Sequence, residues 1–199
     1  MFLSQFQAVG YDLVVRGLAS YSGNMSIRMG DRLIITRRGC MLSRLTEMDL
    51  IETGVDRNDR ATPSASPEIA FHRAIYRATQ AQAIVHAHPP TAVALSFIED
   101  TIVPIDTEGK LSLGSVPVIG KDGTSDLKMI VEEASESFCD HNSVIVRGHG
   151  SFATGQLLEE AYQWTTTLED SCRVLWLLKM FTLGERERVA NLFLTKGIL

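Results

Sequence analysis

Two histidines, His86 and His88, stand one residue apart in the stretch AIVHAHPP, after an apolar run and before two prolines. The apolar run predicts a buried strand, on which residues i and i+2 point to the same face. Both imidazoles can therefore reach one metal ion from the same side. Taken alone, such a pair is a weak metal signal, because most histidines are surface residues or have ordinary hydrogen-bond partners.

A third histidine and a carboxylate lie in comparable settings. His149 sits between two glycines directly after the apolar stretch SVIV, where the backbone is free to turn sharply. Glu68 follows SASP, in which Ser66 can cap a helix and Pro67 suits its first position. Three neutral imidazoles and one carboxylate make a suitable donor set for a zinc-type divalent ion.

The elements that must position these side chains alternate without a regular repeat. We expect a mixture of strands and helices, which predicts an α/β protein: an α/β/α sandwich around a central, largely antiparallel or mixed sheet, in a single domain over residues 1–199. His72 is expected to be an ordinary helix residue and His141 a solvated turn residue. The expected helices cover 2–16, 66–78, 89–97, 124–139 (capped by Thr124 or Ser125), 157–182 and 185–196, and the expected strands lie within 21–28, 32–36, 51–55, 81–88, 101–106, 115–120 and 143–150.

Composition narrows the class of protein. The net charge of −5, from 19 basic and 24 acidic residues, argues against a general nucleic-acid binder. The three cysteines are far apart and show no CxxC spacing, which indicates reduced thiols rather than a disulfide framework or a thiolate zinc site. No targeting segment is evident, and no stretch approaches the roughly 20 apolar residues that a membrane span needs. We therefore expect a cytoplasmic protein with neither nucleic acid nor membrane as a partner.

Four segments, in order and spacing, resemble the class II aldolase/adducin family, the group typified by fuculose-1-phosphate aldolase. They are GLASYSGNMSIR, SPEIAFHRAIY, AIVHAHPPTAVAL and VRGHGSFATG, the last leading into EEAYQWTTTLEDSC. The resemblance implies a Zn²⁺ site made by Glu68, His86, His88 and His149, with Mn²⁺ or Co²⁺ as alternative ions. It also implies a homotetramer whose active sites form where neighbouring subunits meet.

The resemblance further implies a lyase. The expected reaction is aldol cleavage of a small phosphorylated sugar, a ketose phosphate similar to fuculose 1-phosphate, through a metal-stabilised enediolate with Glu68 as the base. A decarboxylase, dehydratase or epimerase acting on another small anionic substrate is the alternative. An adducin-like binding module without catalysis is least favoured, because such members lose the metal ligands and this chain has all four.

Three turns match the places where the family holds the substrate's phosphate. Turns rich in Gly, Ser and Asn present backbone N–H groups to anions, although SGN alone is more typical of a plain hairpin turn. The implied residues are Ser22, Gly23 and Asn24 in the first turn, Thr36 and Gly39 in the second, and Ser66 in the third.

The chain departs from the family in these turns. Tyr21 stands where a threonine is frequent, and Pro67 stands where a second phosphate-binding serine is common. Arg37 and Arg38 replace smaller residues. An anionic substrate is still expected, held as a phosphate or as a carboxylate.

The proton donor is a further departure. Where the family has a tyrosine, the matching segment VPIDTEGKLSLG offers Thr107. Glu108 follows it, and the dehydratase branch of the family uses a glutamate near this place. Glu108 is therefore a candidate acid/base group, with a plain loop carboxylate as the alternative.

Overall fold

The central strand of the fold is the apolar run before the histidine pair. The computed structural model describes residues 2–19, 22–120 and 127–195, with Leu127 and residues 183–195 described by backbone alone. Its eight strands are β1 (Asn24–Met29), β2 (Arg32–Thr36), β3 (Leu50–Gly54), β4 (Ala83–Ala87), β5 (Thr101–Ile102), β6 (Val116–Ile119), β7 (Ser143–Val146) and β8 (Gly150–Gly155). All five residues of β4 are buried, because β1 and β8 flank the strand and helices cover both of its faces.

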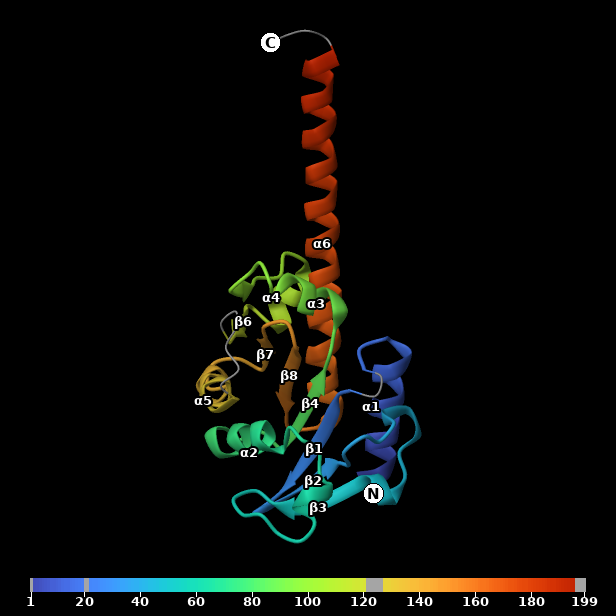
Figure 1. Ribbon diagram of the computed structural model, residues 1–199, viewed down its shortest axis with the longest axis vertical. Helices are drawn as coiled ribbons and strands as arrows, with labels where there is room; N and C mark the ends of the chain where they lie inside the picture. Colours follow the sequence, from blue (N-terminus) through green and yellow to red (C-terminus); the bar gives the residue numbers. More distant parts are fainter. Residues whose placement is uncertain (1, 20–21, 121–126, 196–199) are drawn as a thin grey trace.

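The strands form one mixed sheet in the order β3-β2-β1-β4-β8-β7-β6-β5 (Figure 1). Every neighbouring pair is antiparallel except β6 and β7. In the register of β1 and β4, Asn24 lies opposite His86. In the register of β4 and β8, His86 lies opposite Phe152.

Helices cover both faces of the sheet. They are α1 (Phe2–Val15), α2 (Ile69–Ala78), α3 (Pro90–Leu95), α4 (Thr107–Ser112), α5 (Leu127–Ser137) and α6 (Leu158–Thr195), with three short 3-10 turns, η1 (Leu42–Arg44), η2 (Glu47–Asp49) and η3 (Thr62–Ser64). α1 and α6 pack through one core on one face, and α2 and α5 pack through a second core on the other. The predicted α/β/α sandwich around a largely antiparallel mixed sheet is confirmed.

Several boundaries differ from the sequence prediction. One continuous helix, α6, replaces the two expected over 157–182 and 185–196, and it extends well beyond the sheet (Figure 1). The segment contains no proline, and a single glycine costs a helix only about 1 kcal/mol. α4 was not predicted; Asp106 caps it by accepting a hydrogen bond from the backbone N–H of Gly109 at 2.8 Å. The expected caps Thr124 and Ser125 lie outside the described residues.

A buried carboxylate of α6 fixes the chain just after the histidine pair. Glu169 accepts hydrogen bonds from the backbone N–H of Thr91 (3.0 Å), the hydroxyl of Thr91 (2.7 Å) and the backbone N–H of Ala92 (3.1 Å). Arg173, one turn along α6, lies 3.0 Å from the same carboxylate. These contacts cap α3 from outside and hold its first turn against α6.

No helix within the described ranges combines the length and apolar character that crossing a bilayer would require.

Candidate metal centre

His86, on β4, is completely buried. Its Nδ1 lies 2.9 Å from the carbonyl oxygen of Ser151 on β8, and a carbonyl only accepts, so Nδ1 carries the proton and donates it. Burial, reinforced by the neighbouring histidines, lowers the pKa of His86 to about 3 despite the opposing charge of Glu68. His86 is therefore neutral, with a free lone pair on Nε2, which is the form that binds a metal.

His88 follows the last residue of β4. Its backbone N–H donates to the carbonyl of Leu18 at 2.7 Å, which holds the strand end against the segment after α1. Its Nε2 lies 2.8 Å from Nε2 of His86. Burial also lowers the pKa of His88, so this imidazole too favours the neutral form.

His149 reaches the same point from the turn between β7 and β8. Gly148, before it, has a φ of 67°, a conformation that non-glycine residues rarely adopt. Gly150, after it, lies against the backbone of Ala87 with no room for a side chain. The metal-binding atoms of His86, His88 and His149 all lie within 4.8 Å of one another.

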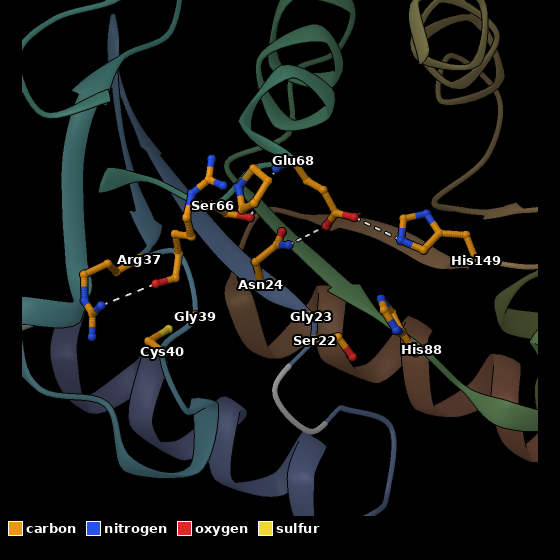
Figure 2. Close-up of a pocket in the computed structure, with 12 residues that line it drawn as sticks. Ser22, Gly23, Asn24, Arg37, Gly39, Cys40, Ser66, Glu68, His88 and His149 are labelled. Atoms are coloured by element: carbon orange, nitrogen blue, oxygen red, sulfur yellow. Dashed lines mark hydrogen bonds and ion pairs between the residues drawn. The ribbon is translucent and has the colours of Figure 1, made fainter. Parts of the chain in front are cut away.

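Glu68 stands immediately before α2, and its carboxylate lies between Asn24 and His149 (Figure 2) and also contacts His86. One oxygen is 3.0 Å from Nε2 of His149, and the other is 3.1 Å from Nε2 of His86. Asn24 donates to the second oxygen at 2.5 Å. Burial alone would raise the pKa of Glu68, but the hydrogen bonds from His149 and Asn24 lower it to about 2, so the carboxylate is ionised at neutral pH.

This cluster fits a divalent ion of the zinc type. The lone pair of His86 Nε2 and an oxygen of Glu68, both acceptors, lie 3.1 Å apart, an arrangement that a cation beside them would stabilise. Neutral imidazole nitrogens and a carboxylate oxygen are donors that such ions prefer. His86 also has the hydrogen-bonded second nitrogen that is usual for a metal-binding histidine.

A cavity of about 300 Å³ opens beside the cluster (Figure 2). Among its lining residues are Glu68, His88 and His149. The others are Ser22, Gly23, Asn24, Arg37, Arg38, Gly39, Cys40, Ser66 and Pro67. Three of the four candidate metal donors and the three turns expected to bind an anion thus face one space.

The structure does not bring every expected anion-binding residue to this cavity. Thr36 is fully buried, and its hydroxyl accepts a hydrogen bond from the backbone N–H of Met25 at 3.2 Å, so its side chain does not line the cavity. The amide of Asn24 already has a partner in Glu68. Ser66 lines the cavity, and its hydroxyl accepts from the backbone N–H of Glu68 at 3.3 Å. Tyr21 lies outside the described residues.

The two arginines differ in their partners. Arg37 donates through Nε and Nη2 to one oxygen of Asp49, at 3.1 and 2.7 Å. Within the described part of the chain, the guanidinium of Arg38 has no hydrogen-bond or ion-pair partner, although Arg38 lines the cavity. Arg38 is therefore the cation available to an anion entering this space.

Glu108 lies elsewhere in the chain. It is exposed on α4, where the hydroxyl of Ser112 donates to its carboxylate at 3.2 Å, and neither Glu108 nor Thr107 lines the cavity. A catalytic role for Glu108 would require a neighbouring chain to bring it to the site.

Sequence reasoning missed His72. It is fully buried on α2 and lies 2.5 Å from Oδ1 of Asn24 and 2.6 Å from the hydroxyl of Ser26. One available signal was that His72 stands one helical turn after Glu68 and so shares its face of α2. His141, expected to be solvated, is half-buried, and its Nδ1 lies 3.1 Å from the carbonyl of Ser115.

Comparisons with known proteins identify the family of the chain. Residues 4–176 match the family described as Class II Aldolase and Adducin N-terminal domain. The 3-oxo-tetronate 4-phosphate decarboxylase of Escherichia coli O6:H1 is 29% identical over 171 residues, covering 82% of this chain and 80% of that protein. The L-fuculose phosphate aldolase of Methanocaldococcus jannaschii is 29% identical over 157 residues, covering 78% and 84%.

A solved structure extends the likeness to three dimensions. The crystal structure of L-fuculose-1-phosphate aldolase from Thermus thermophilus has a TM-score of 0.85 and 37% sequence identity, over 90% of this chain and 95% of that one. The family match spans most of the chain, from before the first cavity turn to beyond His149. The protein belongs to the class II aldolase and adducin N-terminal domain family.

Proposed function

We propose that the protein is a metal-dependent lyase that cleaves a carbon–carbon bond in a small phosphorylated sugar, a ketose phosphate similar to fuculose 1-phosphate. One observation carries the proposal: three imidazoles and an ionised carboxylate converge beside a cavity that is also lined by Arg38 and by turns rich in glycine and serine. A binding module without catalysis would have no use for all four donors.

Glu68, His86, His88 and His149 would hold the ion, with Zn²⁺ as the proposed metal and Mn²⁺ or Co²⁺ as alternatives. Such an ion supplies a Lewis acid, which stabilises the negative charge left on a carbonyl oxygen when the neighbouring carbon–carbon bond breaks. The neutral state of His86 and the ionised state of Glu68 are the states that this role requires.

The residues of the chain supply binding and proton transfer. Ser22, Gly23, Gly39 and Ser66 line the cavity at the family's phosphate turns, and Arg38 adds a cation. Glu68, ionised and close to the reacting end of the substrate, exchanges a proton with the carbon beside the carbonyl. Asn24 holds the carboxylate in place.

Decarboxylation is the second candidate. Relatives named 3-oxo-tetronate 4-phosphate decarboxylase match this chain as strongly as those named L-fuculose phosphate aldolase, at 29% identity in both cases. Both reactions leave negative charge on a carbonyl oxygen, so the same residues serve either. The absence of a tyrosine at the family's proton-donor position, where this chain has Thr107, is compatible with either substrate.

We also propose a homotetramer of single-domain chains, each one domain over residues 1–199, acting in the cytoplasm. Glu108 is exposed on α4 and lies away from the cavity of its own chain, so active sites between neighbouring subunits would give it access to one. The free thiols of Cys40, Cys139 and Cys172 suit a reducing compartment. Light scattering should give about four times the 22.0 kDa of one chain; a mass near 22 kDa would contradict the assembly.

Two measurements test the proposed activity. Elemental analysis of protein purified without added metal should find about one divalent ion per chain, and chelation should abolish turnover until Zn²⁺ is restored. A panel of ketose 1-phosphates, with 3-oxo-tetronate 4-phosphate included, should release dihydroxyacetone phosphate from one of the sugars. Release of carbon dioxide alone would favour the decarboxylase, and no metal uptake in a zinc titration would sink both.

A further inference from the structure

A buried row of polar side chains runs from the metal centre into the core behind it. Glu68, His72 and Tyr76 stand four residues apart and so share one face of α2 and the turn before it. Asn24 and Ser26 stand two apart and share one face of β1. The side chains from α2 and those from β1 alternate along the row, in the order Glu68, Asn24, His72, Ser26 and Tyr76.

Four hydrogen bonds join the row. Asn24 Nδ2 donates to Glu68 at 2.5 Å, and Asn24 Oδ1 lies 2.5 Å from His72 Nε2. His72 Nδ1 lies 2.6 Å from the hydroxyl of Ser26, which lies 2.7 Å from the hydroxyl of Tyr76. Asn24 is 5% exposed, Tyr76 1%, and Ser26 and His72 not at all, so water cannot replace these partners.

The charge of Glu68 sets the direction of every bond in this row. An ionised carboxylate only accepts, so the amide of Asn24 must turn its nitrogen to Glu68 and its oxygen to His72. That oxygen also only accepts, so Nε2 of His72 carries the proton. In a neutral imidazole Nδ1 is then an acceptor, which receives the proton of Ser26, while Tyr76 donates to Ser26. Each of the four hydrogen bonds therefore has one direction, running from Tyr76 through Ser26 to His72, and from His72 through Asn24 to Glu68.

We propose that His72 is a positioning residue for Glu68. Through Asn24, His72 holds the carboxylate in the orientation that faces His86 and His149. This inference rests on the proposed function. A packing role alone would be served better by apolar side chains, since burying a polar row stabilises a core little beyond what apolar groups give. Outer partners of this kind usually change metal affinity or activity 10- to 100-fold when removed.

Cobalt binding tests the proposal without relying on turnover. In the full-length protein stripped of metal, Co²⁺ is titrated and its visible absorption bands, which report the ligands and their geometry, are recorded. His72→Leu should bind Co²⁺ about ten-fold more weakly, with bands shifted towards those of Glu68→Gln. His72→Gln keeps an N–H directed at Asn24 and should restore the affinity to within about three-fold.

Graded variants separate positioning from folding. Ser26→Ala removes the donor to His72 Nδ1 and should have an intermediate effect, and Tyr76→Phe leaves Ser26 free to donate and should have the smallest. His141→Leu, at a histidine that does not line the cavity, should leave the Co²⁺ titration unchanged. On the substrate identified by the panel, His72→Gln should keep the kcat that His72→Leu loses, with KM similar in both.

Each outcome decides the matter. Wild-type Co²⁺ affinity and bands in His72→Leu, while Glu68→Gln is weakened, would overturn the positioning role and leave the proposed function intact. Unchanged Co²⁺ binding in Glu68→Gln would instead remove Glu68 from the ligand set and contradict the proposed function itself. If thermal unfolding shows that His72→Leu does not fold, Ser26→Ala decides: unchanged affinity, bands and kcat would overturn the proposal.

Discussion

Gly150 lies so close to His88 that a β-carbon on it would come within 2.8 Å of the imidazole Cδ2 atom. The same β-carbon would lie 3.0 Å from Cε1 of His86 and 2.5 Å from the carbonyl oxygen of Ala87. The first residue of β8 therefore leaves room for the imidazoles of His86, on β4, and His88, just after it, to pack against the strand. A glycine here is a requirement of the metal centre as well as of the turn.

Replacing Gly150 by alanine should disrupt the metal centre. No side-chain rotation can relieve the contact with the backbone oxygen of Ala87, so the end of β4 and both imidazoles must shift, at a cost of about 1–3 kcal/mol. The matched control is Gly30→Ala, where a β-carbon meets nothing within 4 Å but φ is 65°. Both variants should lower the melting temperature, and only Gly150→Ala should weaken Zn²⁺ binding. Equal Zn²⁺ affinity in the two would contradict this account.

Glu68→Gln should lower turnover far more than it weakens substrate binding. The amide keeps the size of the carboxylate but cannot accept the proton, and positioned acid–base groups contribute typically 10²–10⁴-fold to rate. We expect a kcat at least about 100-fold lower with KM changed by no more than a few-fold, read from steady-state kinetics on the cleaved sugar phosphate. Glu159→Gln, at an exposed position on α6, is the control. Retained kcat would remove Glu68 from the proton-transfer role.

Arg38→Gln should weaken binding of an anionic substrate. Arg38 lines the cavity and its guanidinium has no partner among the described residues. A hydrogen bond to a charged group contributes about 1.5–3 kcal/mol, which corresponds to roughly ten-fold or more in affinity. KM for the sugar phosphate should rise by about this factor, with kcat changed less. Arg60→Gln, at an exposed arginine that does not line the cavity, should change neither constant. A normal KM in Arg38→Gln would place the anion elsewhere.

The loop that leads to Glu68 should lose stability in acid. The pKa of Asp59 is lowered from 3.8 to about 2. The largest cause is the hydrogen bond from the hydroxyl of Thr53; burial acts in the opposite direction, and hydrogen bonds from the N–H groups of Ala61 and Thr62 lower the pKa further. A depressed pKa means that the ionised carboxylate stabilises the folded state above about pH 4, and that this contribution fades as the pH falls towards 2.

Melting temperatures of Asp59→Asn and the wild type, measured across pH, check this predicted pH dependence of stability. The variant should melt at a lower temperature at pH 6, and the difference should shrink steadily between pH 4 and pH 2. Asp140→Asn, at an exposed residue, serves as the control for the loss of one carboxylate. A difference in melting temperature that is independent of pH would contradict the stabilising role of the charge.

The parts of the site that follow local periodicity were predictable. Alternation along AIVHAH places His86 and His88 on one side, and the glycines around His149 mark a sharp turn. No local sequence pattern predicts that Glu68 lies beside these histidines. Glu68 and His149 are 81 residues apart in the sequence, and only the resemblance to a family implied their contact. The predicted start of α2 was also wrong: the helix was expected from residue 66 but begins at Ile69. The N–H of Ile69 donates to the carbonyl oxygen of Ser66 in a separate turn that precedes the helix.

His72 shows where single-sequence reasoning ends. Its partner Asn24 lies 48 residues earlier, on a strand whose place beside β4 depends on the whole sheet. The pattern of α2 marks His72 as facing inwards but does not say which strand residue it meets. The helix end expected before residue 185 was wrong for a different reason. One glycine is a weak local signal for ending a helix, and the helix-forming residues on both sides of it outweighed that signal.

The carboxylate of Glu169, which caps α3 just after His88, gives the site an order of assembly. Ribosomes release the chain from its N-terminus, so the strand that carries the histidine pair emerges long before the helix that secures its far end. His149 also arrives late. A nascent chain that ends before residue 169 lacks this clamp, so the chain after His88 is secured only once α6 has been made as far as Glu169.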